Sequence, residues 1–188
     1  MEFVSLTQLW LPILASAAIV FVASALAWTA LPHHKRDWGK LPDEEKILSG
    51  LRMHNVGPGH YMFPHTTDMA EFKSEEFQKR LSEGPVGLMI VQTANVRTNM
   101  GKPMLLSFVY YLVVAIFVAY VTGSTVGAGE EYMRVFRISG TVATIAYTAA
   151  MFPDAIWFGR QWASTWKSVV DGVVYGLLTA GVFGWLWP

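Results

Sequence analysis

Cysteine is absent from the 188 residues of this chain, which removes disulfides, thiolate metal ligands and cysteine nucleophiles from the available chemistry. An excess of one charge is also missing, because 14 Lys and Arg balance 14 Asp and Glu. Nucleic-acid-binding proteins usually carry a clear basic surplus, so nucleic acid is not expected as a partner. The sequence has no phosphate-binding glycine loop, nucleophile elbow or acidic magnesium cluster. These absences weigh against an enzyme, and no catalytic residue is predicted.

Four long apolar stretches are what the sequence does contain. A bilayer core about 30 Å thick is crossed by a helix of about 20 apolar residues. The stretches that meet this length are 9–31, 103–122, 137–158 and 168–187. No basic residue precedes the first stretch, and it is longer than the apolar part of a secretory signal, so we expect it to be retained. The sequence therefore predicts an all-α membrane protein, a single polytopic domain over 1–188 with four transmembrane helices.

Positive charge is concentrated between the first two apolar stretches. Residues 32–102 carry ten of the fourteen Lys and Arg residues. Those close to helix ends are Lys35, Arg36, Lys40, Arg97 and Lys102. Membrane-flanking segments rich in Lys and Arg stay in the cytoplasm. We therefore expect residues 32–102, a segment of about 70 residues, to be cytoplasmic and both termini to lie outside.

Two short elements are expected within this segment. Ser74 precedes two acidic residues and is typical of a helix N-cap, which predicts a helix over 74–81. The run 85–91 is apolar but too short for its periodicity to distinguish a β-strand from a segment at the membrane interface. Both alternatives remain open for 85–91.

All five histidines lie between the first and second apolar stretches. Three of them, His54, His60 and His65, fall on a stretch rich in Gly and Pro that also carries two methionines. Imidazole nitrogen suits zinc, copper, iron and nickel, and thioether sulfur suits copper(I). The three histidines are therefore candidate ligands for a transition metal, although their spacing matches no established motif. The alternative is that they are turn or interface residues.

The other two histidines, His33 and His34, directly follow the first apolar stretch and precede Lys35 and Arg36. A basic cluster beside a membrane attracts anionic lipid, by about 1 kcal/mol for each Lys or Arg near the surface. We expect these four residues to contact lipid headgroups and to anchor the end of the first helix.

Two acidic residues, Asp154 and Asp171, lie in the third and fourth apolar stretches, each about one turn from the link between them. A carboxylate within a membrane needs a partner. Candidate partners by sequence distance are Arg160, Lys167 and Tyr175. The pattern favours a salt-bridge lock between the third and fourth helices, and the alternative is a proton or cation relay.

Glycines recur along the fourth stretch. Small residues spaced four apart let helix backbones approach closely, and in lipid this packing replaces the hydrophobic attraction between helices. The glycines concerned are Gly172, Gly176, Gly181 and Gly184. They predict close packing, either within the bundle or between protomers.

Several short strings resemble a family of small bacterial inner-membrane proteins with four spanning helices. The strings are LPHHK at 31–35, LPDE at 41–44, YMFPH at 61–65, EGPVG at 83–87, IWFGR at 156–160 and GWLWP at 184–188. The resemblance extends over most of the chain. It implies a bacterial cytoplasmic membrane, and it implies no activity, cofactor or ligand.

Strong membrane anchors combined with few reactive groups favour a non-catalytic accessory or scaffold protein, which self-associates or binds a larger membrane complex. The alternative is binding or transport of a metal or small cation through the His/Met stretch, Asp154 and Asp171. A third, weaker hypothesis is a membrane enzyme with a site between Tyr61, His65 and one of the two aspartates.

Overall fold

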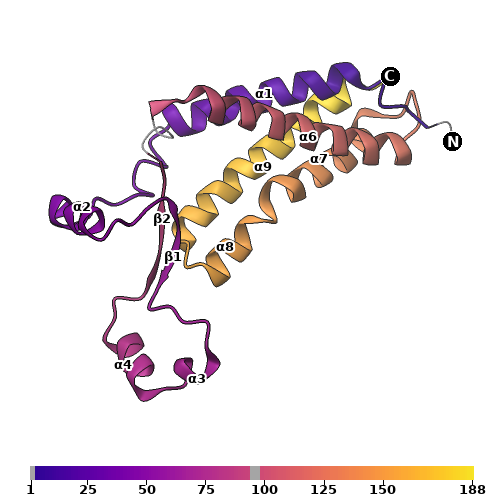
Figure 1. Cartoon of the computed structure of the whole chain (residues 1–188). Coiled ribbons are helices and arrows are strands. Elements are labelled where there is room, and N and C mark those ends of the chain that lie inside the picture. The colour runs from indigo at the N-terminus through magenta and orange to yellow at the C-terminus, as the bar shows by residue number, and fades with distance from the viewer. Residues whose placement is uncertain (1–2, 94–97) are drawn as a thin grey trace. The chain divides into compact units, whose positions relative to one another are not determined.

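The computed structural model describes residues 3–93 and 98–188, so that Arg97 lies outside the described residues. The chain is mostly helical and divides into two compact units (Figure 1). Unit 1 contains residues 1–38 and 101–188, and unit 2 contains residues 39–100. The residues between the first two apolar helices thus form a compact unit of their own within the chain.

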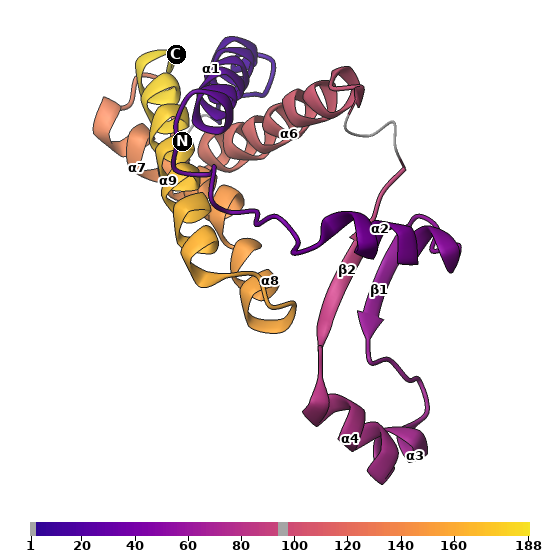
Figure 2. The same cartoon turned by 90° about the vertical axis from the view of Figure 1, so that its left-hand side faces the viewer.

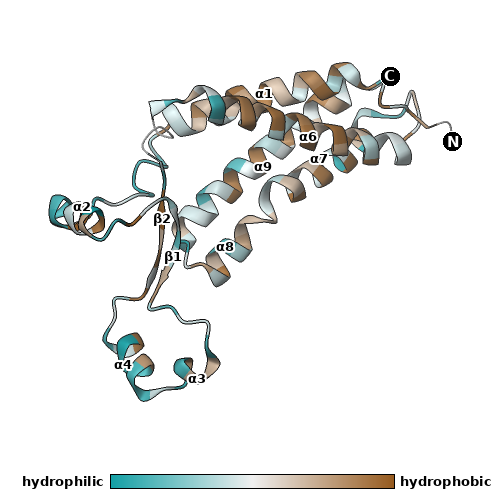
Figure 3. Cartoon of the chain, viewed as in Figure 1, coloured by the Kyte–Doolittle hydropathy of each residue, from teal (hydrophilic) through white to brown (hydrophobic). Residues whose placement is uncertain are grey.

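In the described part of unit 1, four helical spans are long and apolar enough to cross a membrane, as expected from the sequence. Apolar residues cover much of α1 and α6 in particular (Figure 3). The third span consists of two consecutive helices. The helices are α1 (Trp10–Thr29), α6 (Gly101–Thr125), α7 (Tyr132–Thr148) with α8 (Met151–Trp157), and α9 (Trp162–Trp185).

The third and fourth spans extend beyond the apolar stretches that predict them. The third begins at Tyr132 and is interrupted at residues 149–150. Pro153 accounts for the interruption, since it has no N–H to donate and its ring crowds the carbonyl four residues earlier. The fourth begins at Trp162, so Lys167 lies on α9 and not in a link. Hydropathy marks the lipid-buried part of a helix, whereas the helix itself continues through polar turns at its end.

Helix α9 lies between α1 and α7 and packs against both, while α6 packs against α1 and α7 (Figure 2). The fully buried side chains at the centre are mainly small or β-branched. They include Ala17, Val20, Val118, Ala119, Val135, Ala143 and Ala180, together with Phe183. Small side chains allow the helices to approach closely, which is the main source of helix association in lipid.

The two termini meet at one end of unit 1. The Val4 amide donates to the Gly123 carbonyl (3.1 Å), and the Gly129 amide donates to the Pro188 carbonyl (2.7 Å). The Trp187 indole donates to the Gly127 carbonyl (2.8 Å). Because α9 ends here and α1 begins here, the start of α9 and the end of α1 lie at the opposite end.

Among its described residues, unit 2 contains a two-stranded antiparallel hairpin and three short helices. The elements are α2 (Glu44–Met53), β1 (Gly59–Phe63), α3 (Met69–Phe72), α4 (Glu75–Glu83) and β2 (Gly87–Val91). The strand alternative for 85–91 is therefore the one observed. The helix expected after Ser74 is confirmed as α4, with the Ser74 hydroxyl accepting from the Phe77 amide (3.2 Å).

Replacement of Ser74 by alanine is expected to destabilise α4 by about 1 kcal/mol, because the Phe77 amide loses its capping acceptor. Hydrogen exchange of the amides of α4 should accelerate about fivefold. Ser82→Ala is the matched control, because the Ser82 hydroxyl donates to a carbonyl within the same helix and caps nothing. Equal exchange rates in the two variants would contradict the capping role.

Candidate functional site

A group of buried and partly buried ionisable side chains lies at the end of unit 1 opposite the termini. It comprises His33, His34 and Asp37 on the link after α1, and Lys167 and Asp171 on α9. We call these five residues the His–Asp cluster. Its two halves are 130 to 138 residues apart in the sequence, and the folding of α1 beside α9 brings them together.

His34 is the centre of the cluster because each of its ring nitrogens faces a carboxylate. Nδ1 lies 2.6 Å from Oδ2 of Asp37, and Nε2 lies 2.7 Å from Oδ2 of Asp171. His33 approaches the same carboxylate, with Nε2 at 3.1 Å from Oδ1 of Asp171. Lys167 donates to Oδ1 of Asp37 at 2.6 Å. The side chains thus form one continuous hydrogen-bonded network.

The side chains of the network differ in how far they are exposed to solvent. The side chains of His34 and Asp37 are only 3% and 6% exposed, whereas those of His33 and Lys167 remain about one-third exposed, at 30% and 32%. The Trp28 ring stacks on the His34 ring, with centroids 4.0 Å apart and planes 4° from parallel. Aromatic stacking and the two carboxylates together fix both the plane and the rotation of the His34 imidazole.

The network raises the pKa of His34 and lowers the pKa of Asp37. Burial opposes the charged form of His34, but hydrogen bonds to Asp171 and Asp37 and the two negative charges outweigh burial and raise its pKa. Burial also opposes the charged form of Asp37. Hydrogen bonds from Lys167, His34 and Ser164 overcome this cost and lower the pKa of Asp37 to about 2. The geometry therefore favours an imidazolium between two carboxylates, and with Lys167 the four charges balance.

The lock expected between Asp154, Asp171, Arg160 and Lys167 is not what the structure contains. Asp171 binds the two histidines, and Lys167 binds Asp37. Arg160 donates to the Ser168 hydroxyl at 2.7 Å. Asp154 is exposed, and its carboxylate has no ion pair among the described residues. The partners differ because residues on the 30–38 link reach α9 and satisfy its carboxylate first.

His33 and His34 therefore face Asp171, and His34 is buried and unavailable to headgroups. The neighbouring Lys35 and Arg36 are exposed at the end of α1 and remain candidates for lipid contact. Sequence reasoning missed Asp37, whose only signal is its position three residues after His34.

His54, His60 and His65 all lie in unit 2, where they are exposed. Within residues 3–93 and 98–188, they do not form a group whose ligand atoms converge. His60 is part of β1 and is paired with Ile90 of β2.

The glycines of α9 pack mostly against α7 of the same chain. A Cβ atom at Gly172 would lie 2.7 Å from Cγ2 of Thr148, and one at Gly184 would lie 2.6 Å from the Tyr132 ring. One at Gly176 would overlap Thr144. Gly181 has more space, because its nearest neighbour would be the Tyr132 hydroxyl at 3.9 Å. These glycines therefore allow α9 to pack closely against α7 within the same chain.

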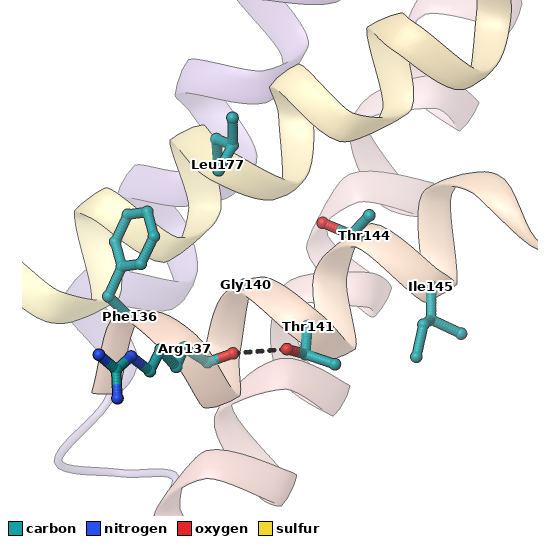
Figure 4. A pocket seen from close by; sticks show the side chains of 7 residues that line it. All are labelled: Phe136, Arg137, Gly140, Thr141, Thr144, Ile145 and Leu177. Atoms are coloured by element: carbon teal, nitrogen blue, oxygen red, sulfur yellow. Dashed lines mark hydrogen bonds between the residues drawn. The ribbon is translucent and has the colours of Figure 1, made fainter. Parts of the chain in front are cut away.

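An open pocket lies between α7 and α9, away from the His–Asp cluster (Figure 4). It is lined by Phe136, Arg137, Gly140, Thr141, Thr144, Ile145 and Leu177. The Thr141 hydroxyl donates its hydrogen to the Arg137 carbonyl of its own helix (2.7 Å). The lining is otherwise mainly apolar, as expected of a helix surface in lipid.

Comparisons with protein-family models, curated proteins and solved structures gave no match to this chain.

Proposed function

We propose that this chain is a non-catalytic multi-pass membrane protein that serves as an accessory or scaffold subunit of a larger membrane complex. In this proposal the four apolar spans lie in the bacterial cytoplasmic membrane, both termini lie outside, and residues 32–102 lie in the cytoplasm. The distribution of Lys and Arg supports the orientation. The observation that carries the partner-binding role is an apolar face on the hairpin of unit 2.

This hairpin face carries three apolar residues, Met62 on β1 and Leu88 and Ile90 on β2, together with His60, which is paired with Ile90. Met62 is directly opposite Leu88, so their side chains lie on the same side of the sheet, and Ile90 follows two residues later on that side. The three residues are 51%, 45% and 62% exposed. A two-stranded hairpin is marginally stable in water unless one face is covered.

Unit 2 has little core of its own with which to cover this face. Among its described residues, Phe77 is the one buried large apolar side chain. Units of this size usually need an additional support such as a disulfide, a metal or a partner. Since the chain has no cysteine, a protein partner on the hairpin face supports the unit best.

The membrane helices support a non-transporting role. Helix α1 carries no charged residue, and α6 carries only Lys102, in its first turn. From Gly172 to its end, α9 carries none. A path for ions across the bilayer would need polar or charged groups through both halves of the membrane.

Site-specific photo-crosslinking in intact membranes tests the proposal. A photoreactive amino acid at Leu88 or Ile90 is expected to capture a second polypeptide, seen as a heavier band whose mass assigns another subunit or a second copy. The same group at Lys79, which is exposed on α4, is the matched control and should capture none. Absence of a heavier product at both hairpin positions, together with a monodisperse monomer in mild detergent, would contradict the proposal.

A further inference from the structure

The His–Asp cluster contains three side chains arranged as the ligands of one metal ion. The atoms concerned are Nε2 of His33, Nε2 of His34 and an oxygen of Asp171, and they all lie within 4.8 Å of one another. Metal–nitrogen and metal–oxygen bonds of about 2.0–2.2 Å place two ligands of the same ion about 3–3.5 Å apart. The two His–Asp distances, 3.1 and 2.7 Å, are close to this separation. Small side-chain shifts are enough to admit an ion.

The orientation of His34 is the second observation that points to a metal. Its Nδ1 faces the Asp37 carboxylate at 2.6 Å, and that carboxylate also accepts from Lys167. A carboxylate in this position keeps the hydrogen on Nδ1, so a neutral His34 would present the lone pair of Nε2 toward Asp171. Metal-binding histidines are held in the same way by a carboxylate on their second nitrogen.

If the cluster were only a structural ion-pair network, the presence of His33 beside Asp171 would have no explanation. His34 already pairs with Asp171 at 2.7 Å, and Lys167 already pairs with Asp37. His33 adds a second imidazole on the same carboxylate, and its side chain is 30% exposed. Because the side chain of His33 is one-third exposed and that of Asp171 is 15% exposed, an ion can enter from water and reach the buried His34.

We propose that His33, His34 and Asp171 bind one divalent first-row transition metal ion of the zinc or iron(II) type. Two imidazole nitrogens and one carboxylate oxygen suit these ions, whereas calcium and magnesium prefer all-oxygen sites. Three protein ligands leave at least one coordination position open to water or another ligand. The ion takes the place of the proton between His34 and Asp171, so its binding releases protons. This site is independent of the partner-binding role proposed for unit 2.

The test uses the full chain in detergent, purified with a histidine-free tag, treated with a chelator and titrated with Co²⁺. One equivalent of Co²⁺ should bind, produce visible d–d absorption and be displaced by Zn²⁺. His33→Ala should abolish this absorption while the buried His34–Asp37–Lys167 contacts keep the bundle folded, as checked by size-exclusion chromatography and circular dichroism. Asp37→Asn should weaken binding about 10–100-fold, since Asp37 positions His34 without contacting the ion.

The matched control is the triple variant His54→Ala, His60→Ala, His65→Ala, which removes the histidines of unit 2 and should bind Co²⁺ as the unaltered chain does. Retention of the absorption in a folded His33→Ala variant would overturn the proposal. So would its loss in the triple variant, or the absence of any Co²⁺ binding by the unaltered chain.

Discussion

Replacement of Asp37 by alanine is expected to destabilise unit 1 by about 3 kcal/mol, because it leaves charged neighbours without their partner in a buried site. The Asp37 carboxylate accepts from Lys167 and faces His34, and its side chain is 6% exposed. His34 is buried and cannot turn to water, whereas Lys167 is one-third exposed and recovers part of its hydration. The expected cost is therefore at the lower end of about 3–5 kcal/mol for breaking a buried ion pair. Unfolding in mixed micelles, titrated with a denaturing detergent and followed by circular dichroism, measures it.

Asp154→Ala is the matched control, because this aspartate also lies near the end of a spanning helix and has the same chemistry. Its carboxylate is exposed and unpaired among the described residues, so its removal should change the free energy of unfolding by less than about 0.5 kcal/mol. Similar losses in the two variants would show that the His–Asp cluster does not hold the 30–38 link to α9.

The four long apolar helical spans were predictable from the sequence because their signal is local. A run of apolar residues long enough to cross a bilayer is sufficient to identify α1 or α6, whatever the rest of the chain does. The ends of the helices are less predictable, because local hydropathy does not show how far a helix continues into polar residues. The first turns of α9 contain Lys167 and two tryptophans, so the apolar stretch begins only after these turns although the helix already includes them. In the third span, Pro153 was visible, but the site of the break depends on the geometry of the preceding turn.

The His–Asp cluster was only half predictable. The cost of a carboxylate in an apolar helix predicts that Asp171 has a partner, and this is a property of one residue. The identity of the partner is not a property of one residue. His34 lies 137 residues away and reaches Asp171 only because α1 packs beside α9. Asp37 carried still less signal, because an aspartate among basic residues near a membrane is equally typical of an exposed turn. Long-range pairing of this kind depends on the tertiary fold.

Substitution of alanine for Gly176 is expected to destabilise the α7–α9 contact by about 1–3 kcal/mol, the usual cost of overfilling a packed interface. The added Cβ would overlap the Thr144 hydroxyl and would lie 3.0 Å from the Thr144 Cα and amide nitrogen. The hydroxyl can rotate away, but the backbone atoms cannot, so the two helices must separate. Separation loses close packing along the seam, and in lipid no hydrophobic attraction compensates for it. The same unfolding titration measures the loss.

Gly181→Ala is the control that separates crowding from the general effect of adding a methyl group to a helix. It lies on the same helix five residues later, and its new Cβ would be 3.9 Å from the nearest neighbouring atom, an ordinary contact. Because alanine favours the helix over glycine by up to about 1 kcal/mol, this variant should be neutral or slightly more stable. The difference in sign between two glycine-to-alanine changes on one helix is the specific expectation. If both variants lost stability equally, the seam of α7 and α9 would not depend on the close approach at Thr144.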